Sequence, residues 1–147
     1  MESGGVACYR IYRTADGRFV TLGGEDERFW ANFCNAVDKS EWVSRIHDQV
    51  PQIDLIKEVQ NMFNNQPLEF WNRLLDDVDC CFETVLTTSE VSRHPQVAAR
   101  QLVSEGDEPN SFFQVAYPAW VNGAPPKSRP PPRYVCMDDI LKAWNLE

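Results

Sequence analysis

Residues 79–100 constrain the fold more than any other stretch of the chain. They open with a short apolar run, Cys80 to Leu86, whose length and β-branched content predict a buried strand. Thr87 and Glu90 are spaced as a capping box, so the strand should lead directly into a helix. Pro95 excludes helical geometry at the residue before it and can begin a second helix. The stretch therefore predicts a strand, a capped helix, a kink and another helix, but it does not indicate a catalytic or binding site.

A β-hairpin is expected upstream of this stretch. Tyr9–Thr14 and Arg18–Leu22 read as strands joined at Ala15-Asp16-Gly17, where Asp-Gly is a strong hairpin signal. With Cys81–Leu86 they should form an antiparallel sheet of three or more strands. Apolar residues at helical spacing predict helices that cover one face of the sheet through Phe33, Ile56, Phe63, Trp71 and Leu74. The predicted fold class is α+β.

The C-terminal part of the chain has a different character. Residues 123–136 are rich in proline and predict an extended arm, of which residues 123–133 alone could reach ~30 Å. The short helix expected over Asp138–Glu147 would be unstable alone in water, because it carries an apolar side made of Ile140, Leu141 and Trp144. That helix should dock on its own domain or on a second copy. We expect a homodimer on this ground.

Length and charge limit the classes of function. At 147 residues the chain is expected to form a single domain, residues 1–147. A net charge of -8 argues against nucleic acid and anionic membranes as partners. No apolar run reaches the ~18 residues that a membrane span needs, and the first residues do not read as a secretion signal. Five cysteines without a Cys-x-x-Cys pair indicate reduced thiols in a cytoplasmic protein and no metal site.

Cysteines and histidines are the first candidates for catalysis. Cys80 and Cys81 lie in the predicted buried strand beside acidic residues, so we expect both thiols to be buried and inert rather than nucleophilic. His94, before the kink, is expected to make a structural hydrogen bond, because no acid or nucleophile is spaced to orient it. His47 is expected to be solvated.

Acidic residues are the remaining candidates. Asp26 and Glu27 fall at the start of a predicted helix, where the helix dipole favours negative charge. Asp76 and Asp77 follow the end of another helix. A small enzyme built on these four acids would need a cleft and a partner group that perturb them. We expect solvated helix ends instead.

Two groups of residues resemble the family III CoA-transferases, which include formyl-CoA and carnitine CoA-transferases and α-methylacyl-CoA racemases. The family segment reads roughly Asp-x-Cys-x-x-Pro-Val-Leu-x-x-x-Glu-Val, then His-Pro-Gln and Arg. The matching residues are Asp79, Cys81, Val85, Leu86, Glu90, Val91, His94, Pro95, Gln96 and Arg100, with Thr84 in place of the proline. A second match runs through Tyr12-Arg13-Thr14-Ala15-Asp16-Gly17, then Val20, Gly23 and Phe29-Trp30. The resemblance covers about residues 8 to 105 and implies the last third of such an enzyme.

The resemblance implies that the catalytic residues and most of the CoA pocket belong to a domain other than this one. In the family a carboxylate of the larger N-terminal domain attacks the acyl-CoA and carries the acyl group as a mixed anhydride, and that domain supplies most of the CoA pocket. The racemases use a His and Asp pair from the same domain. In the racemases a residue near Asp26 approaches the active site, which makes Asp26 the one catalytic candidate here.

Two functions follow as expectations. The first is a stand-alone small domain, inactive by itself, that lines one wall of an acyl-CoA cleft. It would be either a subunit that needs a separate large CoA-transferase subunit to hold coenzyme A thioesters, or a truncated remnant of such an enzyme. The second is a non-catalytic, self-associating interaction module.

Overall fold

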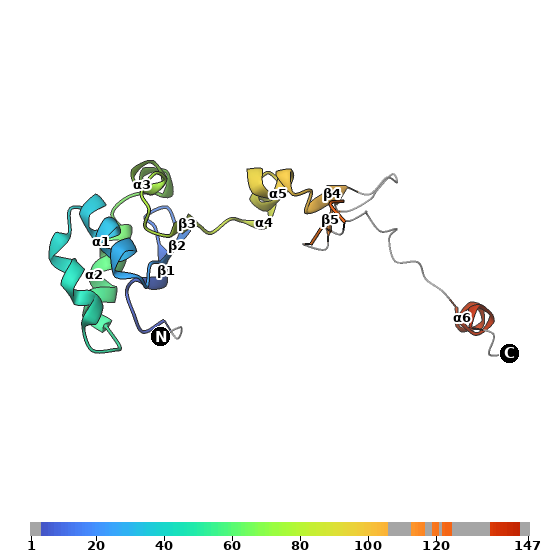
Figure 1. Cartoon of the computed structure of the whole chain (residues 1–147), viewed down its shortest axis with the longest axis horizontal. Coiled ribbons are helices and arrows are strands. Elements are labelled where there is room, and N and C mark those ends of the chain that lie inside the picture. The colour runs from blue at the N-terminus through green and yellow to red at the C-terminus, as the bar shows by residue number, and fades with distance from the viewer. Residues whose placement is uncertain (1–3, 106–112, 117–118, 121, 125–135, 145–147) are drawn as a thin grey trace. The chain divides into compact units, whose positions relative to one another are not determined.

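The computed structural model describes residues 4–105, 113–116, 119–120, 122–124 and 136–144. It divides into two compact units, residues 1–85 and 86–147, and each is described here by itself (Figure 1). Whether the chain folds as a single domain stays a prediction. The Pro-rich arm falls mostly on residues 125–135, which lie outside the described residues.

The first unit contains the antiparallel sheet predicted from the sequence. Its strands are β1 (Tyr9–Arg13), β2 (Phe19–Gly23) and β3 (Phe82–Thr84), in the order β1-β2-β3. Gly17, with φ 80°, makes the turn between the first two strands, and the Thr14 backbone N–H donates to the Arg18 carbonyl across it at 2.9 Å. Such a left-handed position suits glycine, which has no Cβ. The Asp-Gly hairpin is therefore confirmed.

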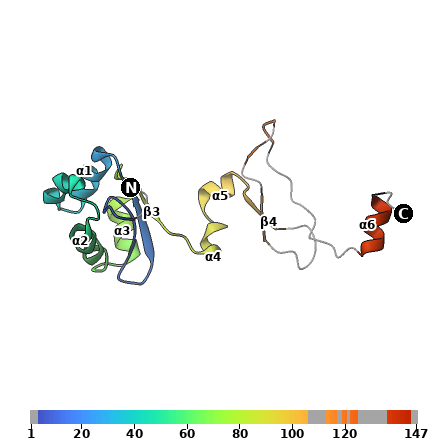
Figure 2. The ribbon, with the colours of Figure 1, turned by 90° about the horizontal axis from the view of Figure 1, so that it is seen from below.

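Four helices complete this unit, and the ribbon shows them gathered beside the sheet (Figures 1 and 2). They are α1 (Glu27–Ala36), the 3₁₀ helix η1 (Ser40–His47), α2 (Ile53–Phe63) and α3 (Leu68–Leu75). The buried side chains of the helices pack with those of one sheet face: Tyr12, Val20, Leu22, Trp30, Phe33, Leu55, Val59, Phe63, Trp71 and Leu75. The α+β fold with helices on one face of the sheet is confirmed.

Phe63 lies at the centre of this core. Its ring centroid is 5.3 Å from that of Tyr12, 6.0 Å from Phe33 and 4.8 Å from Trp71. One aromatic side chain thus joins the sheet to α1, α2 and α3. Three of the five predicted helix contacts, Phe33, Phe63 and Trp71, are buried as expected.

Of the other two predicted contacts, Ile56 packs against the core although it is only half-buried. Leu74 needs correction, because it is 37% exposed. On α2 the inward stripe runs through Leu55 at four-residue spacing, and on α3 it runs through Leu75, so each predicted residue sits one position away from the buried stripe. One position corresponds to about 100° around a helix, which leaves Ile56 at the edge of the core and turns Leu74 out of it.

The run Cys80 to Leu86 also differs from the expected buried strand. Only residues 82–84 form β3, as an edge strand, and their side chains are half-buried or exposed. Cys81 has φ 55°, a left-handed conformation that interrupts the extended chain just before the strand. The ladder therefore begins later than the apolar run does.

The described residues of the second unit form three short helices and a two-stranded ladder. α4 (Thr88–Val91) begins with the predicted capping box, in which the Glu90 carboxylate accepts from the Thr87 backbone N–H at 2.7 Å. α5 (Pro95–Ala99) follows the kink, and β4 (Val103–Glu105) pairs antiparallel with β5 (Phe113–Val115). The terminal helix is α6 (Met137–Ala143). Among the described residues, no helix has the length and apolar content to cross a membrane.

Candidate functional site

The turn from β2 into α1 places the catalytic candidate Asp26. Gly23 and Gly24 hold the chain against both neighbouring segments, since their backbone N–H groups donate to the carbonyls of Cys81 at 3.0 Å and Cys8 at 2.9 Å. A Cβ on Gly24 would lie 3.3 Å from the Cys80 carbonyl oxygen, which is tighter than ordinary van der Waals contact. Glycine therefore suits this close backbone approach better than a residue with a Cβ does.

Asp26 is the N-cap of α1. Its backbone is extended, and its carboxylate oxygen Oδ1 accepts from the Arg28 backbone N–H at 2.8 Å. An aspartate at this position satisfies one of the free N–H groups of the first helical turn and interacts favourably with the helix dipole. The expectation of a solvated acid at a helix end is confirmed for Asp26. Its carboxylate remains exposed, so it can still meet a ligand.

Charged side chains around this helix start connect three segments of the first unit. The His47 Nε2 atom at the end of η1 lies 3.2 Å from the Glu27 carboxylate, and both side chains are exposed. The Arg28 guanidinium lies 3.4 Å from the Asp79 carboxylate in the loop before β3. Asn32 donates its side-chain amide to the Asp79 carbonyl at 2.9 Å. Both charged pairs were missed from the sequence, because they join residues 20 to 51 positions apart.

Asp76 and Asp77 take no part in these contacts. Asp76 caps the C-terminal end of α3, Asp77 follows it, and both are exposed. The loop reaches α1 through Asp79, a residue of the family-like stretch. Within the described part of the chain, no cluster of His, Cys, Asp and Glu could hold a metal ion.

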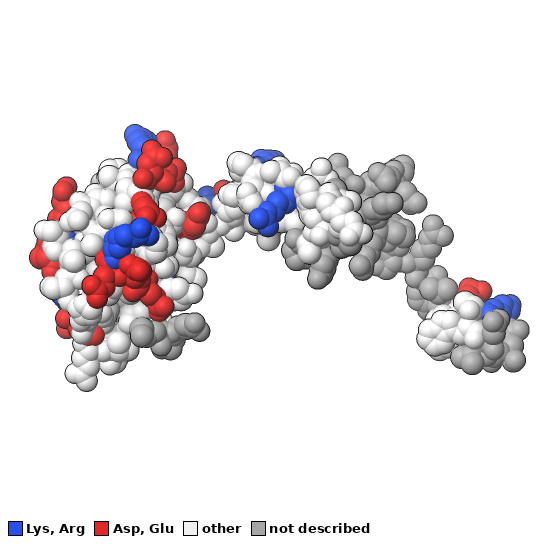
Figure 3. Space-filling model, in the orientation of Figure 1, with Lys and Arg blue, Asp and Glu red and all other residues white. Residues whose placement is uncertain are grey.

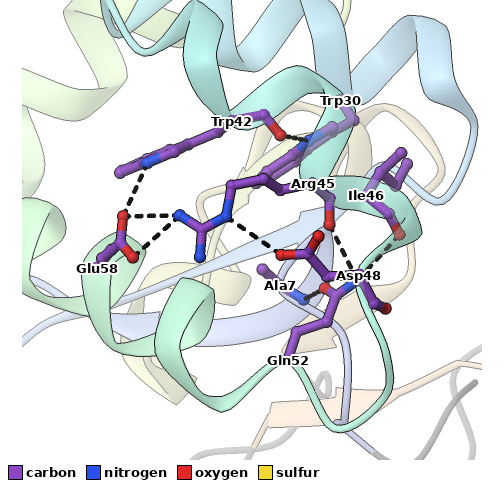
Figure 4. A network of polar contacts seen from close by, with 8 residues as sticks. All are labelled: Ala7, Trp30, Trp42, Arg45, Ile46, Asp48, Gln52 and Glu58. Atoms are coloured by element: carbon purple, nitrogen blue, oxygen red, sulfur yellow. Dashed lines mark hydrogen bonds and ion pairs between the residues drawn. The ribbon is translucent and has the colours of Figure 1, made fainter.

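A polar network beneath the helix start fixes η1 against α1 and α2 (Figure 4). The Trp30 indole N–H donates to the Trp42 carbonyl at 3.0 Å, and the Trp42 indole N–H donates to the Glu58 carboxylate at 3.0 Å. Both oxygens of Glu58 accept from Arg45 Nη1, at 3.0 and 2.9 Å. Because Trp30 lies on α1 and Arg45 on η1, the network sets where η1 presents His47.

Gln52 closes the same network from inside the protein. Its side chain is buried, and its Oε1 accepts from the Ala7 backbone N–H at 3.0 Å. Its Nε2 donates to the Ile46 carbonyl at 2.9 Å (Figure 4). This single side chain joins the segment before β1 to the C-terminal end of η1. No sequence motif marks it, since a glutamine between helices is most often exposed.

The structure separates the two neighbouring cysteines. Cys80 is buried, and burial raises the pKa of its thiol. Both observations agree with the expectation that this thiol is unreactive. Cys81 is exposed, and the expectation that it is buried was wrong. Its left-handed backbone turns the side chain away from the position that alternation along a strand would give it.

His94 makes the structural contact expected of it. It is the N-cap of α5, and its Nδ1 atom accepts from the Gln96 backbone N–H at 3.3 Å. The hydrogen bond caps a short helix, as the kink at Pro95 requires. His47 is exposed as predicted, although its contact with the Glu27 carboxylate was not foreseen.

Comparisons with known proteins identify relatives of this chain. A family model described as "CoA-transferase family III" matches residues 2–135. The chain is 28% identical over 95 residues to human alpha-methylacyl-CoA racemase and 25% identical over 107 residues to the mouse protein. These matches cover 64% and 71% of this chain but only 25% and 28% of the racemases, so the chain spans about a quarter of their length.

Solved structures show the same fold. A crystal structure of a mutant of Rv3272 from Mycobacterium tuberculosis superimposes with a TM-score of 0.61 at 18% identity, covering 78% of this chain and 33% of that one. An orthorhombic crystal form of Rv3272 gives the same TM-score over 80% of this chain and 36% of that one.

Proposed function

Since the chain belongs to CoA-transferase family III, we propose that its first unit forms one wall of an acyl-CoA cleft. The proposal rests on the exposed N-terminus of α1, which presents Asp26 beside the Gly23-Gly24 turn. This turn belongs to the stretch that resembles the family. A larger part, from the same longer protein or from a separate subunit, would supply the other wall and the attacking carboxylate.

The residues of this wall suit binding better than covalent chemistry. Nucleophilic catalysis needs a nucleophile activated by an adjacent base or cation. At the start of α1, Asp26 caps the helix, while Glu27 and Arg28 make exposed contacts with His47 and Asp79. We propose that the chain by itself does not turn over acyl-CoA, and that Asp26 acts only when the second wall is present.

The negative charge of the first unit should make its binding of coenzyme A weak. Residues 1–85 carry 15 Asp and Glu against eight Lys and Arg, and acidic side chains gather in several places over this unit in Figure 3. Phosphates prefer clustered cations, so this acidic unit binds free CoA weakly. An acyl-CoA seated at the α1 N-terminus would meet backbone N–H groups there, but also the negative charge of Asp26.

The proposal is tested by removing that charge without removing the cap. Asn caps a helix about as well as Asp, so Asp26→Asn should leave α1 intact. At low ionic strength, a ligand-detected NMR titration should show tighter binding of a short-chain acyl-CoA, by severalfold, because one repulsive charge within a Debye length of the phosphates is gone.

Asp54→Asn is the matched control, because Asp54 is an acid in the first turn of α2. That variant should bind as the wild type does. If the two variants have the same effect, or if the wild type shows no acyl-CoA binding at millimolar concentration, the ligand does not seat at α1. Turnover of an acyl-CoA by the purified chain would contradict the proposal that catalysis needs the second wall.

A further inference from the structure

Arg28 is a basic residue at an acidic helix start. Residues 23–30 contain three acids and no Lys or Arg besides Arg28. Arg28 lies in the first turn of α1, two positions after the N-cap Asp26. The helix dipole favours negative charge at this end of a helix and opposes a cation. The stability of α1 therefore does not account for an arginine at this position.

Two contacts hold the Arg28 guanidinium beside the helix start. Its central carbon lies 4.5 Å from the centroid of the Phe29 ring, and a stacked guanidinium can still donate from the N–H groups in its plane. Its Nη2 atom lies 3.4 Å from the Asp79 carboxylate. That separation exceeds the about 2.7–2.9 Å of a strong charge-assisted hydrogen bond. The two side chains are 66% and 68% exposed, so this ion pair is weak.

The backbone contacts on both sides of the pair do not depend on the two charges. The Arg28 backbone N–H donates to the Asp26 carboxylate, which caps α1. The Asp79 backbone carbonyl accepts from the Asn32 side-chain amide at 2.9 Å. The helix start and the loop before β3 therefore keep their places when the pair opens. The Arg28 side chain can exchange one anion for another without a change in the fold.

On the basis of the acyl-CoA cleft wall proposed above, we propose that Arg28 binds a phosphate of the coenzyme A and that Asp79 competes with this phosphate. The N–H groups of a guanidinium form a planar fork that matches phosphate as well as carboxylate. A phosphate carries more negative charge than a carboxylate, so it displaces the loosely held Asp79. The wall then selects thioesters that carry phosphates over those that carry none.

The charges around the helix start make Arg28 the residue on which such selection depends. Asp26 and Glu27 repel phosphates. The His47 imidazole lies 3.2 Å from the Glu27 carboxylate, on a different contact from that of Arg28. Residues 76–84, which include the loop that reaches α1, contain no Lys or Arg. Of these two segments, only Arg28 supplies a cationic side chain for a phosphate.

NMR titrations with acetyl-CoA and with acetyl-pantetheine, at low ionic strength, separate the effect of the phosphates from that of the thioester. Arg28→Gln should bind acetyl-CoA about fivefold more weakly than the wild type does, because an exposed ion pair is worth less than about tenfold. Binding of acetyl-pantetheine, which lacks the phosphates, should not change. Arg73→Gln is the matched control, since Arg73 forms an exposed pair with Glu69 on α3 at 3.1 Å. It should bind acetyl-CoA as the wild type does.

Asp79→Asn should have the opposite effect. It should tighten acetyl-CoA binding about threefold, because Arg28 then has no competing carboxylate. The Asp79 backbone carbonyl remains, so the loop should stay in place. In the Arg28→Gln background the same change should have a much smaller effect, since the two residues act through each other. Glu69→Gln, the matched control, should leave binding unchanged.

Each way of failing has its own signature. An Arg28→Gln variant that binds acetyl-CoA like the wild type, or that loses acetyl-pantetheine binding equally, would overturn the role of Arg28 while the cleft wall stands. Equal tightening by Asp79→Asn with and without Arg28 would show that Asp79 acts only by repulsion, and would overturn the competition. A wild type that binds neither thioester at several millimolar would contradict the cleft wall, and the role of Arg28 with it.

Discussion

Replacing Gln52 by alanine should destabilise the first unit by about 2–4 kcal/mol. The change removes the partner of the Ala7 backbone N–H, which is fully buried, and an unsatisfied buried donor costs about 1–3 kcal/mol. It also removes the 2.9 Å hydrogen bond to the Ile46 carbonyl, worth about 1 kcal/mol. Two weaker contacts, to the carbonyls of Arg45 and Asp48 at 3.3 Å, add little.

Urea denaturation followed by tryptophan fluorescence measures this loss. With an m value of about 2 kcal/mol/M, the unfolding midpoint should fall by about 1 to 2 M. Gln60→Ala is the control, since Gln60 exchanges two hydrogen bonds with the Arg13 backbone where water can replace them. That variant should lose about 1 kcal/mol or less. If Gln60→Ala costs as much as Gln52→Ala, burial does not decide the cost and the reasoning is wrong.

Three further predictions concern other parts of the structure. Gly24→Ala should lower the free energy of unfolding by about 1–3 kcal/mol, because its Cβ would lie 3.3 Å from the Cys80 carbonyl oxygen. Gly23→Ala should be nearly neutral, and equal losses in the two variants would contradict this reasoning. A thiol reagent should label the exposed Cys81 and Cys136 in the native protein, and should label the buried Cys8, Cys34 and Cys80 only after unfolding. Burial raises the pKa of Cys34 to about 12, so its thiol should be unreactive in the folded state. Labelling of all five cysteines in the native protein would contradict the burial of these three side chains. Hydrogen bonds from Thr14 and Leu68 lower the pKa of Asp16 below its ordinary 3.8, so Asp16 stabilises the fold fully above that pH and loses this effect as the pH falls through the pKa of the folded state. The free energy of unfolding of Asp16→Asn should therefore fall less steeply at acid pH than that of the wild type. An unchanged pH dependence would count against these hydrogen bonds.

Features set by neighbouring residues could be predicted from the sequence. The Asp-Gly hairpin, the Thr87–Glu90 capping box and the His94 cap before Pro95 all depend on residues within a few positions of each other. Their chemistry is local, so the same residues favour the same geometry in most folds. The acidic helix start at Asp26 belongs to this class.

Features set by distant residues could not be predicted. Whether Leu74 or Leu75 turns inward depends on where α3 rests on the core, and both choices fit a helical apolar pattern. The left-handed backbone at Cys81 follows from the way the chain enters β3 beside Gly23. The Gln52 network joins residues up to 45 positions apart, and no spacing in the sequence marks such a contact.

The position of the acyl-CoA is the most direct test of the proposed function. Amide chemical shifts of the isotope-labelled chain can be followed while a short-chain acyl-CoA is added. The largest changes should fall on residues 23–28 at the start of α1 and on residues 79–81, which contact that helix start. Changes confined to other elements, such as α2, or no changes up to several millimolar ligand, would contradict a cleft wall at α1.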